Sequence, residues 1–151
     1  MENLKIYGFR ANIDSVGDTL SKINEIKEDS QIIQLLNADA IASRNHVIHG
    51  VNQAVNAFER GENIANDLGV EILLRCSAQR QISKAFKILG LCEGEMNLCA
   101  VLIDCDDYID LEMLETLYNI SEEKHTDLIL FKLMNFNHET NKEYNTYYYD
   151  M

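Results

Sequence analysis

Four stretches of the chain have the hydrophobic patterns of strands. Apolar and polar residues alternate over residues 3–9, as expected for a strand with one buried face. Residues 30–36 are short and apolar, and residues 70–76 (VEILLRC) form a similar run, so both predict strands. Residues 97–104 are continuously apolar, which predicts a strand at the centre of a sheet because both of its faces would be covered.

Helical spacing of apolar residues predicts the remaining elements. The predicted helices span about residues 15–27, 40–60, 78–89, 110–117 and 121–136. Asp14 and Ser15 are suited to cap the first helix, and a capping position for the second falls near Asn37–Asp39. Gly61 and Gly90 are suited to end the second and third. The last segment is compatible with a helix or a strand, and we expect a helix.

This succession of elements indicates an α/β or α+β fold in one compact domain. We expect a sheet of about four strands, mixed or antiparallel, with the helices packed on it. The domain should occupy residues 1–136, and the polar, tyrosine-rich residues 137–151 should form a mobile tail.

The composition is that of an ordinary globular protein. Of the 151 residues, 46% are hydrophobic and 25% are charged, which excludes an intrinsically disordered chain. No apolar run reaches the roughly 18 residues that a membrane-spanning helix needs. The N-terminus also lacks the pattern of a secretory signal. We therefore expect a cytoplasmic protein that does not enter a membrane.

The four cysteines lack the spacing of a metal site or a redox motif. Cys76, Cys92, Cys99 and Cys105 form no CxxC pair, and all except Cys92 lie in apolar runs. We expect those three to be reduced, buried side chains that behave as small apolar residues. No metal ion or other cofactor is expected.

The bases of this acidic chain are concentrated in one stretch of the sequence. The formal net charge of −12 argues against nucleic-acid binding, because phosphate contacts depend on lysine and arginine. Yet residues 72–92 contain no acid and hold Arg75, Arg80, Lys84 and Lys87. On one helix the last three share a side, which is either a solvated face or an anion-binding patch. The residues expected on the opposite, core-facing side are Ile82, Ala85, Phe86 and Leu89.

The helix predicted over residues 40–60 has an uncharged outer face. From residue 40 to residue 58 it carries no acid and one base, Arg44, which projects near its apolar side. The polar residues of the outer face are Asn45, His46, His49, Asn52, Gln53 and Asn56. Such a face offers hydrogen bonds without strong hydration, which suits contact with RNA or a protein partner. Packing against a neighbouring element explains it equally well.

Motifs of known catalytic sites are absent from the sequence. His46 and His49 are three residues apart, but no Asp, Glu or Cys nearby completes a metal site. Asp104, Asp106 and Asp107 resemble an acidic metal cluster, although a turn after a strand explains them equally well. No phosphate-binding glycine loop, zinc-protease motif or nucleophile motif occurs. An enzyme is therefore not expected.

Several short motifs in a fixed order resemble one protein family. They are residues 42–47 (ASRNHV), 61–65 (GENIA), 71–74 (EILL) and 77–85 (SAQRQISKA), followed by Gly90. In order and spacing they are similar to the KEOPS-complex subunit known as the PRPK-binding protein (TPRKB) family. The similarity extends over residues 40–92. Gln79 departs from the small residue that the family usually has before its Arg–Gln–Ile motif.

The resemblance implies a compact protein without an active site, which binds the PRPK-type kinase of KEOPS and through it the threonylcarbamoyl-transferase subunit. That complex makes threonylcarbamoyl-adenosine in tRNA, and this subunit is implied to recruit tRNA through its single-stranded 3′ CCA end. The resemblance and the concentration of bases together select the candidate RNA-binding residues. Arg75, Arg80, Gln81 and Lys84 are expected to contact phosphates or splayed bases, and Arg44, Asn45 and His46 to add hydrogen bonds.

Two other functions are compatible with the sequence. The subunit could act only as an allosteric activator of the kinase, without contact to RNA. An enzyme that uses the histidine pair or Asp104–Asp107 is the third hypothesis. The substitution Arg80→Glu separates the first two, because it should abolish tRNA binding and preserve kinase binding only if this subunit holds RNA.

Overall fold

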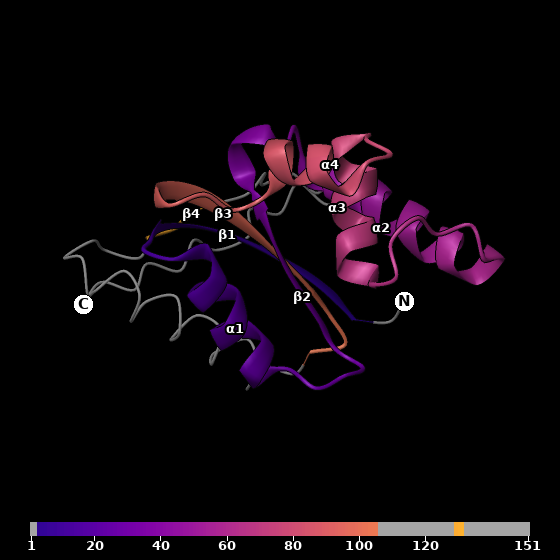
Figure 1. Cartoon of the computed structure of the whole chain (residues 1–151), viewed down its shortest axis with the longest axis horizontal. Coiled ribbons are helices and arrows are strands. Elements are labelled where there is room, and N and C mark those ends of the chain that lie inside the picture. The colour runs from indigo at the N-terminus through magenta and orange to yellow at the C-terminus, as the bar shows by residue number, and fades with distance from the viewer. Residues whose placement is uncertain (1–2, 106–128, 132–151) are drawn as a thin grey trace, which may run out of the picture.

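The computed structural model describes residues 3–105 and 129–131, whose helices and strands are shown in Figure 1. The strands form one antiparallel sheet in the order β2-β3-β1-β4. They are β1 (Leu4–Ile13), β2 (Ile32–Asn37), β3 (Gly94–Ile103) and the short β4 (Ile129–Phe131). The predicted α+β class, with helices packed on an antiparallel sheet, is confirmed, and β1, β2 and β3 correspond to three of the predicted strands.

β3 lies between β1 and β2, as its continuous apolar sequence predicts. Its residues from Leu98 to Ile103 are all buried. Successive side chains point to opposite faces of the sheet, so Leu98 joins one hydrophobic core and Cys99 the other. The central strand therefore supplies both cores.

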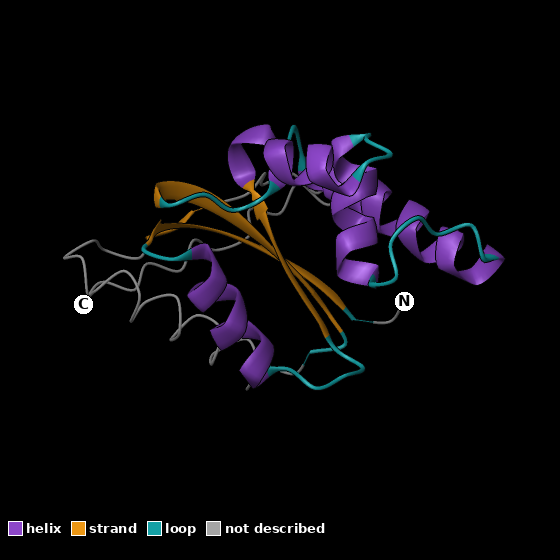
Figure 2. Cartoon of the chain, in the orientation of Figure 1, coloured by secondary structure: helices purple, strands orange, loops and turns teal. Residues whose placement is uncertain are grey.

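Helices cover both faces of the sheet (Figure 2). On one face lies α1 (Val16–Ile26), which packs into the first core through Ile23. The helices that pack on the other face are α2 (Arg44–Arg60), α3 (Leu68–Ser77) and α4 (Ile82–Leu89). The candidate RNA-binding residues all belong to this second helical layer or to the loops within it.

α2 begins later than the sequence predicted. Ala38–Ala40 form the short 3-10 helix η1, which the side chain of Asn37 caps. The main helix is capped instead by Ser43, whose Oγ accepts the N–H of His46 at 2.9 Å. Two helices with separate caps, Asn37 and Ser43, thus occupy the region where the sequence predicted one helix start. The predicted end is confirmed, because Gly61 adopts the left-handed conformation with φ +69°.

The strand predicted over residues 70–76 is wrong, because these residues belong to the helix α3. Asp67 caps this helix by accepting the N–H of Val70 at 3.0 Å. The residues of the run that are fully buried are Glu71, Ile72, Leu73 and Leu74. A helix that is mostly buried lacks a wide polar stripe, so its sequence does not differ in pattern from that of a buried strand.

α4 ends as predicted but begins only at Ile82. Arg80 therefore lies in the preceding loop, and Gln81 occupies the N-cap position. The basic side predicted for a longer helix is incomplete, because only Lys84 and Lys87 lie on the helix itself.

β4 falls within residues 121–136, where a helix was expected, so that prediction is wrong for Ile129–Phe131. These residues pair with Gly8–Arg10 of β1, and local sequence does not show that a neighbouring strand edge is within reach. The helix expected over residues 110–117 and the tail expected over residues 137–151 lie outside the described residues. No helix in the described part is long and apolar enough to cross a membrane.

Candidate RNA-binding site

His46 ties the start of α2 to the end of α3. Its Nε2 lies 2.7 Å from the carbonyl oxygen of Cys76, and its Nδ1 accepts the N–H of Ala42 at 3.0 Å. Because Nδ1 accepts a hydrogen bond, the ring is neutral and carries its proton on Nε2, which donates to Cys76. Both ring nitrogens are thus occupied within the chain. His46 positions the residues around it. In this structure neither ring nitrogen is available for the hydrogen bond to RNA that the sequence predicted.

The loop that joins α3 to α4 lies at the same end of the helical layer. Ala78 ends α3 in the left-handed conformation with φ +54°, and its N–H donates to the carbonyl of Arg75 at 3.2 Å. The turn therefore uses its own polar groups to close the helix. The residues that follow, Arg80 and Gln81, are exposed.

The start of α4 is suited to an anion. No side chain in the described part of the structure caps its first turn, although Gln81 occupies the N-cap position. The first N–H groups of a helix carry the positive end of its dipole. Arg80 precedes this turn and Lys84 lies within it, and both are exposed. Backbone donors and two cations at one helix start fit a phosphate group.

Arg75 adds less positive charge to this site than the sequence suggests. Its Nε and Nη2 lie 2.9 Å and 2.8 Å from Oε1 of Glu71. The side chain of Glu71 is fully buried and that of Arg75 is 29% exposed, so the ion pair sits at the rim of the core. Its charge is already balanced, and contact between Arg75 and phosphate stays a prediction. Arg80 and Lys84 are the stronger candidates.

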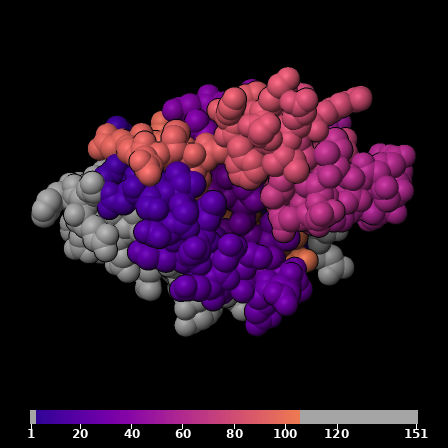
Figure 3. Space-filling model, in the orientation of Figure 1, coloured from indigo at the N-terminus to yellow at the C-terminus, as the bar shows by residue number. Residues whose placement is uncertain are grey.

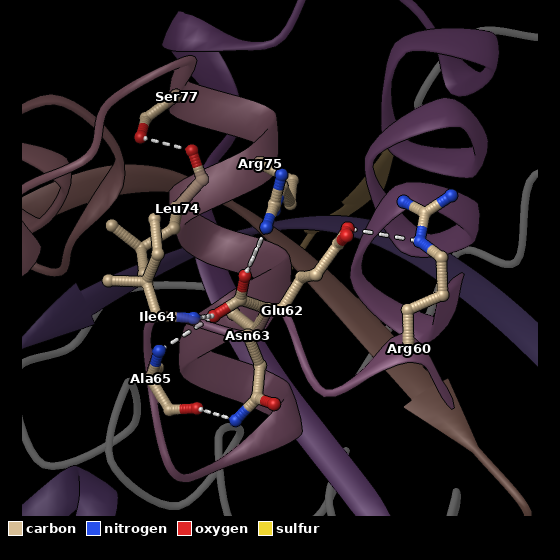
Figure 4. A network of polar contacts seen from close by, with 9 residues as sticks. Arg60, Glu62, Asn63, Ile64, Ala65, Leu74, Arg75 and Ser77 are labelled. Carbon is tan, nitrogen blue, oxygen red and sulfur yellow. Dashed lines mark hydrogen bonds and ion pairs between the residues drawn. The ribbon is translucent and has the colours of Figure 1, made fainter. Parts of the chain in front are cut away.

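Glu71 is a structural centre that the sequence analysis missed (Figure 4). Its second oxygen, Oε2, accepts the N–H of Ile64 at 2.9 Å and the N–H of Ala65 at 2.7 Å. One carboxylate therefore binds the loop before α3 and, through Oε1, Arg75. The available signal was a single acid within the apolar run VEILLRC, because a buried carboxylate needs several donors around it.

The outer face of α2 is open to solvent. Its exposed residues are Asn45, His49, Asn52, Gln53 and Asn56. The alternative that this face packs against another part of the described chain is therefore wrong. Arg44, the first residue of α2, is half-buried.

The predicted metal candidates form no site in the described part. Among residues 3–105 and 129–131, no three His, Cys, Asp or Glu side chains are grouped so that they could hold a metal ion. His46 has both nitrogens engaged, so the histidine pair cannot chelate without breaking its bonds to the backbone. Asp104 is exposed at the end of β3, and Asp106 and Asp107 lie outside the described residues.

The cysteines agree with the prediction from the sequence. All four are free thiols, of which Cys92 is exposed and the other three are buried. Burial raises the pKa of the Cys76 thiol from 9.0 to about 11. Burial also raises the pKa of Cys99 to about 12, and the nearby Cys76 adds to the rise. Thiols with such pKa values are poor nucleophiles near neutral pH.

The apolar side of α4 differs from the prediction. Ala85 and Leu89 are fully buried, as expected. Ile82 and Phe86 were also expected to face the core, but each is 41% exposed, and Ile88 is 42% exposed. The helix therefore meets the core along one narrow stripe, and large apolar side chains are left on its surface.

Comparison with known proteins shows the family. The model of the family described as kinase binding protein CGI-121 matches residues 11–146. The regulatory protein Cgi121 of Methanocaldococcus jannaschii is 35% identical over 120 residues, which cover 75% of this chain and 79% of that protein. Both matches agree with the resemblance to the PRPK-binding protein family seen in the sequence motifs. The chain belongs to the CGI-121 family of kinase-binding proteins.

Proposed function

We propose that this chain is a non-catalytic, cytoplasmic subunit of the KEOPS complex, which modifies tRNA to threonylcarbamoyl-adenosine. In this role it binds the PRPK-type kinase, and through it the transferase subunit, and recruits tRNA by the single-stranded 3′ CCA end. Kinase binding is supported by the description of the family, and a regulatory role by the name of the 35% identical relative. Membership of KEOPS and recruitment of RNA are supported by the sequence motifs and by the placement of the bases.

One observation carries the RNA half of the proposal: exposed bases of an acidic protein lie together at the uncapped start of α4. The chain has a net charge of −12, yet residues 72–92 contain no acid. Arg80, Gln81 and Lys84 occupy this helix start. Backbone N–H groups and cations would bind a phosphate there, and the amide of Gln81 can bond to the edge of a splayed base.

The start of α2 extends the same site. His46, the third residue of α2, binds the carbonyl of Cys76 near the end of α3, and Asn45 is its exposed neighbour in the sequence. Further along, the exposed face of α2 is polar but uncharged. A single-stranded RNA end could lie along such a face and form hydrogen bonds without meeting acidic side chains.

Binding of the purified protein to intact tRNA, and to tRNA that lacks its 3′ CCA, tests the recruitment of RNA. We expect intact tRNA to bind, and both removal of CCA and the substitution Arg80→Glu to abolish binding. Lys22→Glu is the matched control, because Lys22 is an exposed base on α1 and both substitutions change the net charge equally. If both variants lost the same tRNA affinity, the binding would depend only on general electrostatic attraction, which would contradict the proposed site.

The second candidate function is regulation of the kinase without RNA contact. The exposed Ile82, Phe86 and Ile88 favour a protein partner and are compatible with this alternative. If neither form of tRNA binds at any salt concentration while the kinase does bind, this alternative replaces the RNA adaptor. If the kinase does not bind either, the proposed function fails as a whole.

A further inference from the structure

Exposed apolar side chains gather on α4. The large hydrophobic residues of the described chain that expose more than a third of their surface are Leu20, Ile64, Ile82, Phe86 and Ile88. The last three lie on α4, a helix of only 8 residues. Scattered apolar residues on a surface are ordinary, but three on one short helix, two of them on the same side, indicate a surface that a partner covers.

α4 has two different flanks. Ile82 and Phe86 are four residues apart and therefore lie on one side of the helix. Lys84 and Ile88 are also four residues apart, and each is two residues from Phe86, so they lie on the other side. The buried stripe of Ala85 and Leu89 runs between these sides. We call the first side the Ile82–Phe86 flank and the second the Lys84 flank.

The Ile82–Phe86 flank is held in place by the structure beneath it. Ala85 and Leu89 have no exposed surface and fix the helix on the core. At its end, the N–H of Gly90 donates to the carbonyl of Phe86 at 2.8 Å. A Cβ atom at position 90 would overlap that carbonyl, so the chain turns tightly against Phe86. A flank ordered before binding loses little conformational entropy when a partner arrives.

A protein fits the Ile82–Phe86 flank better than RNA does. Apolar and aromatic side chains without a charge are typical of the centre of a protein interface. RNA binding depends on cations, and both cations of α4 lie nearer the other flank, because Lys84 belongs to it and Lys87 is three residues from Lys84. The family is described as kinase binding. The absence of acids from residues 72–92 also complements a partner whose docking surface has an acidic rim.

We propose that the Ile82–Phe86 flank is the docking surface for the kinase and that the Lys84 flank of the same helix stays available to RNA. This inference rests on the proposed function and adds that both partners meet on one short helix. In the space-filling view, α4 lies at the border of the molecule opposite α1 (Figure 3). Because the two flanks point in different directions from the helix axis, a kinase on one leaves the other accessible, and the two partners bind together without competition.

Ile82→Ala and Ile88→Ala form a matched pair for the test. The two residues are of one type, lie on one helix and are 41% and 42% exposed. Binding of the full chain to its PRPK-type kinase is measured by isothermal titration calorimetry. We expect a Kd about fivefold weaker for Ile82→Ala and at least about 30-fold weaker for the double variant Ile82→Ala/Phe86→Ala. Ile88→Ala should bind the kinase like the wild type.

All of these substitutions are neutral and at exposed positions, so circular dichroism and tRNA binding should match those of the wild type. Unchanged kinase affinity of the double variant would overturn the docking surface and leave the proposed function standing. Equal losses for Ile82→Ala and Ile88→Ala would overturn the division of α4 into two flanks. A double variant that binds the kinase but loses tRNA would assign this flank to base stacking. Failure of the wild-type chain to bind the kinase would instead refute the proposed function.

Discussion

At the scale of single residues, His46 shows how one side chain sets the geometry of a site without being available to the ligand. Its Nδ1 accepts a hydrogen bond from Ala42, and its Nε2 donates one to Cys76. An imidazolium ring has no acceptor, so protonation of His46 would remove the bond to Ala42 and keep the bond to Cys76. The bond between α2 and α3 therefore needs only the N–H at Nε2, whereas the bond to Ala42, in the segment before α2, needs the neutral ring.

Replacement of His46 by alanine should lower the free energy of unfolding by about 2 kcal/mol, because it removes the partners of two backbone groups. His49→Ala is the control, since His49 is exposed on the same helix, and its effect should stay within about 0.5 kcal/mol. Urea unfolding followed by circular dichroism measures both. Equal midpoints for His46→Ala and the wild type would mean that water replaces these two bonds without cost.

The buried thiols predict a loss of stability at high pH. In the folded chain the pKa of Cys76 is about 11 and that of Cys99 about 12, compared with an ordinary value of 9.0. Below pH 9 both the folded and the unfolded chain keep these protons, so stability does not change. Between pH 9 and 11 the unfolded chain releases them first, which favours unfolding.

We expect the urea midpoint of the wild type to fall over this pH range. The variant Cys76→Ala should be less stable at pH 7 because a buried side chain is shortened. Its midpoint should nevertheless fall less steeply from pH 9 to 11 than that of the wild type. Parallel pH profiles for the two proteins would contradict this account.

At the scale of elements, the sequence predicted three strands and three helices of the described chain and missed β4 and α3. β1 was predicted because its apolar and polar residues alternate, as in a strand with one buried face. β3 was predicted because its apolar run is continuous, as in a strand with two buried faces. α3 was mistaken for a strand because most of its residues are buried and apolar, and its contacts are with α2, α4 and β2. Its cap, Asp67, was the local signal of a helix start, but it precedes residues that a strand also favours.

The candidate site was predictable only in part, for a similar reason. Arg80 and Lys84 could be predicted to be exposed because they belong to a stretch with several bases and no acid to pair with them. The pairing of Arg75 with Glu71 required α3 to be a helix, because residues four apart meet only in that conformation. The engagement of His46 required the packing of α2 on α3, which no local pattern shows.

Gly50 allows α2 and α3 to approach each other closely. A Cβ atom at position 50 would overlap Cys76 Sγ and would lie 3.2 Å from the Cys76 backbone nitrogen. Gly50→Ala should therefore lower the free energy of unfolding by about 1–3 kcal/mol. In α1, a Cβ at Gly17 meets only Ser15 Oγ, at 4.0 Å, so Gly17→Ala should be neutral or stabilising by up to about 1 kcal/mol. Thermal unfolding tests both, and equal effects would show that α3 can shift to accept the methyl group.

At the scale of the whole molecule, one stretch of the chain differs in charge from the rest, because residues 72–92 hold four of the 13 bases and none of the 25 acids. The formal net charge is −12, so most of the surface repels a polyanion. The acid-free stretch of residues 72–92 is where RNA could approach without that repulsion. An acidic protein can thus select one RNA-binding surface with few bases, because its other surfaces are unfavourable.

The number of phosphates held at this surface should appear in the dependence of RNA binding on salt. Contacts by Arg80 and Lys84 predict a slope of about −1.4 for log K against log salt concentration, at about −0.7 for each single-strand contact. Arg80→Ala should make the slope shallower by about 0.7, whereas Lys22→Ala should leave it unchanged. Fluorescence anisotropy with a labelled CCA-ending oligonucleotide measures this. A slope near zero would exclude phosphate contacts as the source of affinity.

Glu71 has a consequence for the evolution of the surface beside α3. Its carboxylate holds the main-chain N–H groups of the preceding loop, and every residue except proline has such a group. The side chain at position 64, which is 46% exposed, can therefore change during evolution without loss of the hydrogen bonds to Glu71. In a library of all substitutions, position 64 should reject proline and accept most other residues, while position 71 should accept almost none. Position 64 can thus change its side chain and acquire new contacts while the backbone of the loop stays in place.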